Sequence, residues 1–341
     1  MPPTRERREP GISSWITRAV LAELECRGVD AGPLLGRHGL SRAELLDPDG
    51  WIPQRRHARF YRAAIEASGD PAFGVAAGRR APIHVTRVVG HRAALSETLR
   101  EAFDAWGRFS DLVAEDTRFG TQCTPRYDAI TWSRPPGMVP LHDDGPSFAT
   151  AALAFVAHAR GESVPPVEVH LTGPAPMGAQ AVADALGAPI LWGADHFEMR
   201  FPPGTLDLPV RFADPRLGAV LEETARRELA LRDARLATSE RVRAAILRLG
   251  FDRSASIGSV AEEMGTSART LQRRLAGESC TFSEIRATTL RDAAISMLAE
   301  EGATAEEVAF RLGFESRGGF HHAMKRWTGR RPGEWRARRE K

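Results

Sequence analysis

Lysine is almost absent from this 341-residue sequence, because only Lys325 and Lys341 among its 47 basic residues are lysines. The positive charge is therefore carried by arginine, whose planar guanidinium forms paired hydrogen bonds with phosphates and with guanine. A GC-biased genome produces the same excess of arginine. Arginine content alone therefore does not identify a nucleic-acid partner.

Cysteine is also rare, and Cys26, Cys123 and Cys280 form no Cys-x-x-Cys pair. An odd number of isolated cysteines fits packed, inert thiols in a reducing cytosol, with a redox switch as the alternative. No Gly-x-Ser-x-Gly, His-Glu-x-x-His, Gly-x-Gly-x-x-Gly or Walker A string occurs. The sequence therefore predicts no enzyme and no cofactor.

Long apolar runs are missing as well. The longest one, residues 148–159, is too short to span a bilayer, and the charged residues 1–10 do not form a signal peptide. These absences predict a cytoplasmic protein. A hydrophobic content of 42% over 341 residues is enough for two or three domains with their own cores.

Charge is distributed unevenly along the chain. Residues 240–341 hold 19 basic and 14 acidic side chains, a local net charge of +5 in a chain whose total is +3. From Ser316 onward, nine basic residues stand against two acidic ones. A nearly neutral first part followed by a basic tail fits a sensor joined to a domain that binds a polyanion.

The last hundred residues contain one pattern twice. Residues 260–265 (VAEEMG) and 308–313 (VAFRLG) each predict an apolar-striped helix that ends in a glycine turn, and Ser267 and Ser316 then cap a second helix. This is the pattern of a helix-turn-helix, which places its second helix in the major groove of DNA. The region is predicted to be all-α, with seven helices at 239–249, 257–264, 268–276, 282–300, 304–312, 317–328 and 332–338.

The free faces of the two second helices carry the candidate DNA contacts. Arginine reads guanine, glutamine reads adenine, and histidine contacts a base or a phosphate. The candidates are Ala268, Arg269, Gln272, Arg273, Ser316, Arg317, Gly318, His321, His322, Lys325, Arg330 and Arg331. A solvated face on an all-α protein is the alternative for one such helix, and two basic copies in tandem argue against it. Gly318 and Gly319 each cost a helix about 0.5–1 kcal/mol relative to alanine, so the later helix is expected to fray without DNA and to read few bases.

The first 216 residues predict a mixed α+β domain. Helical periodicity is found in residues 11–80, 95–109, 148–160 and 181–186. Short β-like segments occur at 112–115, 129–132, 167–171 and 196–201, and the third of these is expected to have one wet face. A charged helix at 217–236 leads into the second domain.

Several other side chains in the first 216 residues could either bind a ligand or serve an ordinary structural role. His142-Asp143-Asp144 could bind a metal, but no third ligand cluster follows, so a surface turn is favoured and no metal is predicted. Arg79-Arg80 could clamp an anionic effector, although a solvated pair at a helix end is favoured. Core packing is likewise favoured over a pocket lining for five tryptophans, Trp15, Trp51, Trp106, Trp132 and Trp192. The effector-binding residues therefore stay unassigned.

Residues 308–336, VAFRLGFESRGGFHHAMKRWTGRRPGEWR, closely resemble the signature of AraC/XylS-type bacterial transcription regulators. Residues 271–275 (LQRRL) resemble the first repeat of that family. The first part resembles the arabinose-binding-type sensor domain of one branch of the family, at residues 69–74, 95–99, 206–209 and 214–215. Met324 stands where the family usually has an aromatic core residue.

The resemblance implies an effector-sensing and dimerisation domain at 11–216, a linker helix at 217–238 and a DNA-binding domain at 239–341. It implies a transcription regulator, often an activator, that binds double-stranded DNA, forms a homodimer and contacts RNA polymerase. The expected effector is a small apolar or carboxylate molecule that shifts the packing of the 217–236 helix. An effector-independent architectural protein and an enzyme domain fused to a DNA-binding tail are the alternatives.

Overall fold

The computed structural model describes residues 9–81, 86–134, 144–251, 255–298 and 304–333. They form two compact units, an N-terminal unit built mainly from residues up to Leu229 and a C-terminal unit built mainly from Ala230 onward. The predicted α+β first part and all-α second part are both confirmed. Across the described residues, every helix is too short or too polar to cross a membrane.

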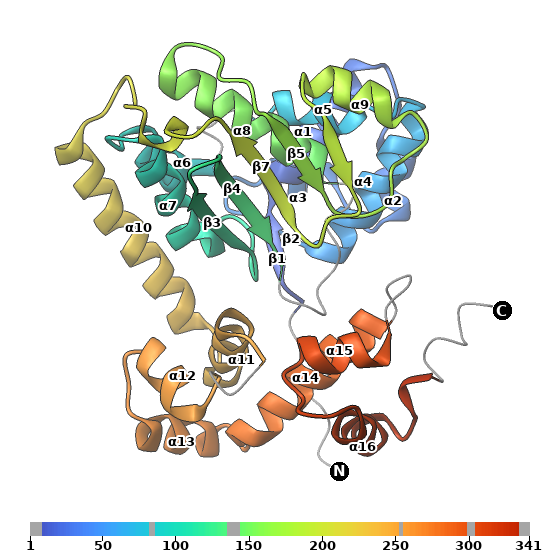
Figure 1. Cartoon of the computed structure of the whole chain (residues 1–341), viewed down its shortest axis with the longest axis vertical. Coiled ribbons are helices and arrows are strands. Elements are labelled where there is room, and N and C mark those ends of the chain that lie inside the picture. Colours follow the sequence, from blue (N-terminus) through green and yellow to red (C-terminus); the bar gives the residue numbers. More distant parts are fainter. Residues whose placement is uncertain (1–8, 82–85, 135–143, 252–254, 299–303, 334–341) are drawn as a thin grey trace. The chain divides into compact units, whose positions relative to one another are not determined.

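The N-terminal unit combines helices with two sheets (Figure 1). Its helices are α1 (Ser14–Cys26), α2 (Gly32–Arg37), α3 (Arg42–Leu46), α4 (Gln54–Ser68), α5 (Phe73–Arg79), α6 (Arg87–Ala94), α7 (Leu99–Phe109), α8 (Gly145–Arg160) and α9 (Ala179–Leu186). Its strands are β1 (Gly11–Ser13), β2 (Trp51–Pro53), β3 (Arg118–Cys123), β4 (Asp128–Ser133), β5 (Glu168–Leu171), β6 (Ile190–Trp192) and β7 (Phe197–Phe201). Two short 3-10 helices, η2 (Ser110–Leu112) and η3 (Thr205–Asp207), complete it.

The larger sheet has the strand order β3-β4-β7-β5-β6. All its neighbouring strands are antiparallel except β5 and β6, which are parallel and are connected through α9. In the centre of the sheet Ile130 pairs with Met199. Strands β1 and β2 form a separate antiparallel pair, in which Ile12 pairs with Ile52.

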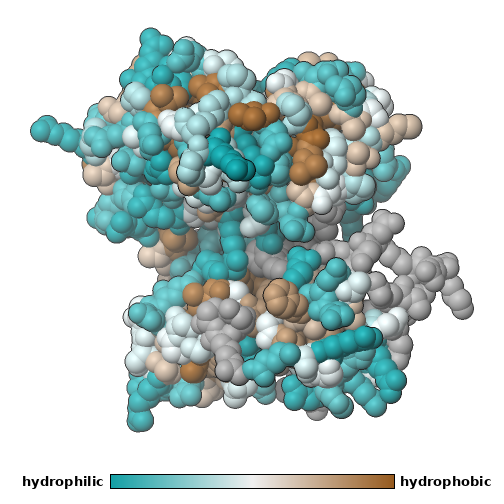
Figure 2. All heavy atoms as spheres, in the orientation of Figure 1, coloured by the Kyte–Doolittle hydropathy of each residue, from teal (hydrophilic) through white to brown (hydrophobic). Residues whose placement is uncertain are grey.

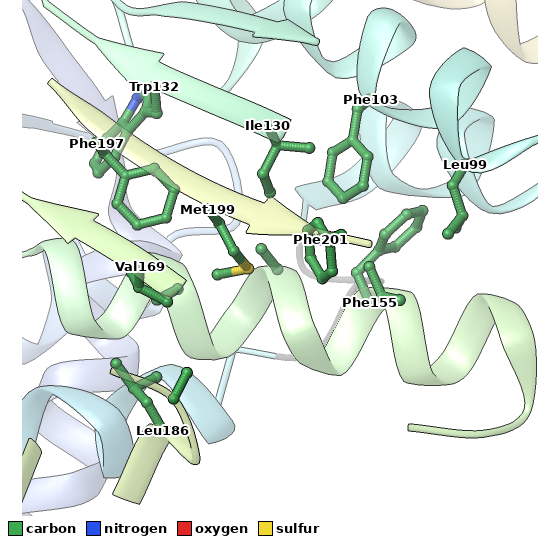
Figure 3. Close-up of a cluster of buried hydrophobic side chains, with 14 of the residues drawn as sticks. Leu99, Phe103, Ile130, Trp132, Phe155, Val169, Leu186, Phe197, Met199 and Phe201 are labelled. Atoms are coloured by element: carbon green, nitrogen blue, oxygen red, sulfur yellow. The ribbon is translucent and has the colours of Figure 1, made fainter. Parts of the chain in front are cut away.

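One face of the larger sheet packs on helix α8 (Figure 3). Val169, Met199 and Phe201 from the strands are fully buried there, and Phe155 of α8 packs against them. Helix α5 lies on α8 so closely that a Cβ on Gly78 would be 2.3 Å from the backbone oxygen of Ser147. Glycine at position 78 is therefore required for this helix pair.

Several local predictions for the N-terminal unit are wrong in detail. The helix expected at 95–109 begins only at Leu99, because the Thr98 side chain accepts a hydrogen bond from the backbone of Glu101 and starts α7 there. Residues 112–115 form no strand, and Ala114 makes only an isolated bridge to Ile12. Strands β1, β2, β3 and β6 were not predicted. The solvent-exposed face expected for β5 is not observed, because His170 on that face is only 9% exposed and lies between two glutamates.

The C-terminal unit contains helices only, among its described residues. Helix α10 (Pro215–Arg235) leads into it, followed by α11 (Thr238–Leu249), α12 (Ile257–Glu263), α13 (Ala268–Gly277), α14 (Phe282–Leu298), α15 (Ala305–Arg311) and α16 (Arg317–Thr328). Six of the seven predicted helices are thus observed. The seventh, predicted at 332–338, lies largely outside the described residues.

Two small cores hold the C-terminal unit together. Adjacent residues of a helix point about 100° apart, so Ile246 of α11 packs into the first core and Leu247 into the second. The first core joins α11 to α12 and α13, and the second joins it to α14, α15 and α16. On the face seen in Figure 2, hydrophobic residues form small separate groups among hydrophilic ones.

Candidate nucleic-acid interface

The first helix-turn-helix is made by α12 and α13. Its turn contains Gly265, whose φ of +62° is a left-handed conformation that glycine adopts without strain. The hydroxyl of Ser267 then accepts a hydrogen bond from the backbone of Thr270 and begins α13. Leu271 and Leu275, one helical turn apart, anchor α13 in the first core. The other faces of α13 are left for solvent or for a ligand.

The second helix-turn-helix, made by α15 and α16, repeats this design with one more residue in its turn. Gly313 takes the left-handed turn with a φ of +71°, and Ser316 caps α16 by accepting from the backbone of Gly319. Phe320 and Met324 are fully buried in the second core. Methionine therefore fills the site of the usual aromatic residue, as its flexible side chain allows.

The predicted contacts on α13 project from its free face. Arg269, Gln272 and Arg273 are exposed, and Ala268 is half-buried. The three exposed side chains make no ion pair or hydrogen bond with any described residue. Other arginines of this unit are neutralised, as where Arg248 lies 2.6 Å from Glu263. The unpaired guanidiniums of α13 are therefore available to phosphates and base edges.

The predicted contacts on and after α16 are less uniform. Arg317, Gly318, His322 and Lys325 are exposed, as are Ser316, whose hydroxyl is used by the cap, and Arg330 and Arg331 beyond the helix. His321 is half-buried, and its Nε2 atom is buried without a hydrogen-bond partner. The exposed ring of His322 is thus the more accessible of the two histidines.

Helices α13 and α16 lie at the same edge of the C-terminal unit, with α14 between them (Figure 1). A carboxylate holds α13 in place, because Glu278 just beyond its end accepts hydrogen bonds from the backbone of Thr238 and Ser239 at the start of α11, at 2.5 and 3.0 Å. Burial raises the pKa of Glu278, but these hydrogen bonds outweigh it and lower that pKa below its ordinary value. Sequence reasoning missed this residue, since its partners lie about 40 positions away.

A buried polar chain in the N-terminal unit was also missed. The carboxylate of Asp144 lies 3.2 Å from Nε2 of His57, and Nδ1 of His57 lies 2.9 Å from the hydroxyl of Thr17. A carboxylate only accepts, so Nε2 of His57 donates to Asp144, while Nδ1 shares a hydrogen bond with the hydroxyl of Thr17. Asp144 thus stands in the expected turn directly before α8, but its side chain is engaged by His57, while His142 and Asp143 lie outside the described residues. Among the described residues, no cluster of three or more His, Cys, Asp or Glu could hold a metal.

The remaining candidates of the N-terminal unit are engaged in its own structure. Arg79 and Arg80 are exposed at the end of α5, as expected, and each is also engaged, because Arg80 forms an ion pair with Glu23 and Arg79 donates to the carbonyl of Ala185. Trp132 is buried between the rings of Phe119 and Phe148. The other four tryptophans, Trp15, Trp51, Trp106 and Trp192, are half-buried.

The expectation that all three cysteines are packed is wrong for two of them. Cys26 and Cys123 are exposed, and Cys280 is half-buried. Burial raises the pKa of Cys123 and of Cys280 above the ordinary value of a thiol. Fewer of these two thiols are ionised at neutral pH, which lowers their reactivity.

Comparison with known proteins agrees with both units. A family model described as the arabinose-binding domain of AraC transcription regulators, N-terminal, matches residues 28–210, and a helix-turn-helix domain model matches residues 260–338. The ornithine utilization regulator of Pseudomonas aeruginosa is 23% identical over 89% of this chain and 93% of its own length. The transcriptional regulator VirS of Mycobacterium tuberculosis is 24% identical over 91% and 92%. The crystal structure of the transcriptional regulator CdpR from Pseudomonas aeruginosa aligns over 94% of this chain and 97% of that chain, with 19% identity and a TM-score of 0.44.

The first of these family models covers more than half of the chain, and the second covers both helix-turn-helix motifs from α12 onward. The local geometry of α12, α13, α15 and α16 is that of two helix-turn-helix motifs. The chain belongs to the AraC family of transcription regulators, with an arabinose-binding-type sensor domain before a helix-turn-helix domain that binds DNA.

Proposed function

We propose that this regulator places α13 and α16 in successive major grooves on one face of its DNA. The twelve residues predicted from the sequence, from Ala268 to Arg331, are its proposed contacts. The observation that carries the proposal is the set of exposed, unpaired side chains of α13, namely Arg269, Gln272 and Arg273. Removing these polar and basic side chains from water costs the least free energy when a phosphate or a base edge takes the place of the water.

The proposed domains are a sensor at 11–216, a linker helix at 217–238 and a DNA-binding domain at 239–341. Helix α10 continues through the boundary between the two compact units. On the sensor side its Ala225 is fully buried with Val89, Phe109 and Val113. A small apolar or carboxylate effector that changes this packing would change how α10 presents the DNA-binding domain, provided that it binds the two arrangements with different affinity.

We further propose that the protein acts as a homodimer through the outer face of α10. Leu217, Val220 and Leu231 are 48%, 61% and 62% exposed on that face. The spacing of seven residues between 217, 224 and 231 lets two antiparallel copies place Leu217 against the partner's Leu231 around a two-fold axis.

The proposed regulatory output is activation by contact with RNA polymerase. Its support is membership of the AraC family of transcription regulators. Transcription from the target promoter in a purified system, with and without the regulator, distinguishes activation from repression.

The central experiment measures binding of the purified protein to duplexes from its own promoter region. We expect a sequence-selective affinity that falls steeply with salt, because phosphate contacts release counterions. Arg269→Ala should relax the preference at one base pair by about 1–3 kcal/mol. If no duplex from that region is preferred over random sequence at any salt concentration, the proposal is wrong.

The effector is tested separately by thermal melting with apolar and carboxylate metabolites. A ligand that binds only the folded protein at 100 times its Kd stabilises it by about 2.7 kcal/mol. A shift that also changes DNA affinity supports effector control. Tight selective binding to DNA without any such ligand favours the effector-independent alternative.

A further inference from the structure

The two recognition helices differ at the positions that face outward in their first two turns. Counting from the serine caps Ser267 and Ser316, the core residues correspond, with Leu271 matching Phe320 and Leu275 matching Met324. The outward positions do not. In place of Arg269, Gln272 and Arg273, α16 has Gly318, His321 and His322.

Packing within the protein does not explain the glycines of α16. A Cβ on Gly318 would meet only the hydroxyl of Ser316, at 4.0 Å, and on Gly319 its nearest neighbour would be that hydroxyl at 3.4 Å. Neither glycine has a positive φ, so the backbone conformation does not require glycine either. Both positions are exposed. Glycine at an exposed helical position where larger residues fit leaves room for the close approach of another molecule.

The other outward residues of α16 are suited to phosphates more than to bases. The Nε2 atom of His321 is buried without a partner, so this histidine cannot present both ring nitrogens to a base pair. Arg317 and Lys325 are exposed at opposite ends of the same face, and neither has a partner among the described residues. Lysine binds phosphate as a point charge and carries little base specificity.

We infer that the two motifs divide the work of DNA recognition, so that α13 reads base edges in its groove, whereas α16 contacts mainly the sugar-phosphate backbone that borders its own groove. The missing side chains at positions 318 and 319 let the first turn of α16 approach the DNA, and Arg317, His322 and Lys325 hold phosphates. The inference rests on the proposed function, because it assumes that both helices meet one duplex.

The first test is a scan of base substitutions across both grooves of a duplex located by footprinting, with the full-length protein. The groove whose preference disappears in Arg269→Ala is assigned to α13. Substitutions in that groove should lower affinity by about 5- to 150-fold, whereas those in the adjacent groove should change it less than about threefold. Equal losses in both grooves would overturn the inference and leave the proposed function standing, while a lack of selectivity anywhere would overturn the proposed function itself.

The second test compares Gly318→Ala with Gly258→Ala. Gly258 is a matched control, because it is the second residue of α12, is exposed, and has only the capping hydroxyl of Ser256 near its Cβ position, at 3.6 Å. Alanine is the better helix former, so both variants should melt at or above the temperature of the parent protein. Only Gly318→Ala should bind DNA more weakly. Unchanged binding by Gly318→Ala, or equal weakening by both variants, would contradict the close approach of α16.

Discussion

Nε of Arg92 donates to the carboxylate of Glu222 over 2.9 Å, and this contact ties the connecting helix α10 to α6. The same carboxylate oxygen lies 3.6 Å from Arg108 of α7. Burial raises the pKa of Glu222, but the hydrogen bond from Arg92 and the charge of Arg108 outweigh it, so the pKa lies below its ordinary value. Glu222 is therefore a charged clamp at the point where α10 leaves the sensor.

Removing this clamp should loosen α10. We expect Glu222→Gln to lower the free energy of unfolding by about 1–2 kcal/mol, because Arg92, Arg108 and Arg226 lose a largely buried charged partner. Urea unfolding followed by tryptophan fluorescence measures the change. Glu223→Gln is the matched control, since its partner Arg227 is an exposed neighbour on the same helix, and it should cost no more than about 0.5 kcal/mol. Equal losses of unfolding free energy in the two variants would mean that Glu222 stabilises the protein no more than an exposed ion pair does.

Acid should release α13 from α11 through Glu278. Its folded-state pKa is lowered, so its contribution to stability is complete above the unfolded value of about 4.3 and is lost as the pH falls through the folded value. We expect the melting temperature to fall more steeply below pH 4.3 in the parent protein than in Glu278→Gln. Parallel curves for the two proteins would show that this carboxylate is not linked to folding.

Dimerisation through α10 should depend on its exposed apolar residues. Val220→Glu places a charge in the proposed interface and should shift the protein from dimer to monomer in sedimentation velocity. Leu46→Glu is the control, because Leu46 is as exposed, at 63%, but lies on α3. A dimer that survives Val220→Glu at the same concentration would exclude this face as the interface.

Arg331, which is exposed beyond α16, should contribute equally to the affinity for every DNA sequence. We expect Arg331→Ala to weaken specific and random duplexes by the same factor and to reduce the slope of log K against log salt by about 0.9, the value for one phosphate contact. Titrations at several salt concentrations give this slope. A loss confined to one base pair would instead place Arg331 at a base edge.

The sequence by itself determined the helix-turn-helix motifs, since their signals are local. A serine cap, a glycine turn and apolar residues one helical turn apart all lie within about twenty residues, and Ser267, Gly265 and Leu271 take the positions that these signals predict. The outward residues of α13 follow from the same periodicity, because the buried positions leave only one face free.

Only the tertiary structure decided which distant residues meet. Glu222 and Arg92 are 130 positions apart, and His57 and Asp144 are 87 apart, so no spacing in the chain relates them. Strand β6 has three residues and is recognisable only from its pairing with β5. Burial and charge pairing of this kind arise when separate segments pack together, whereas caps and turns are specified within each segment alone.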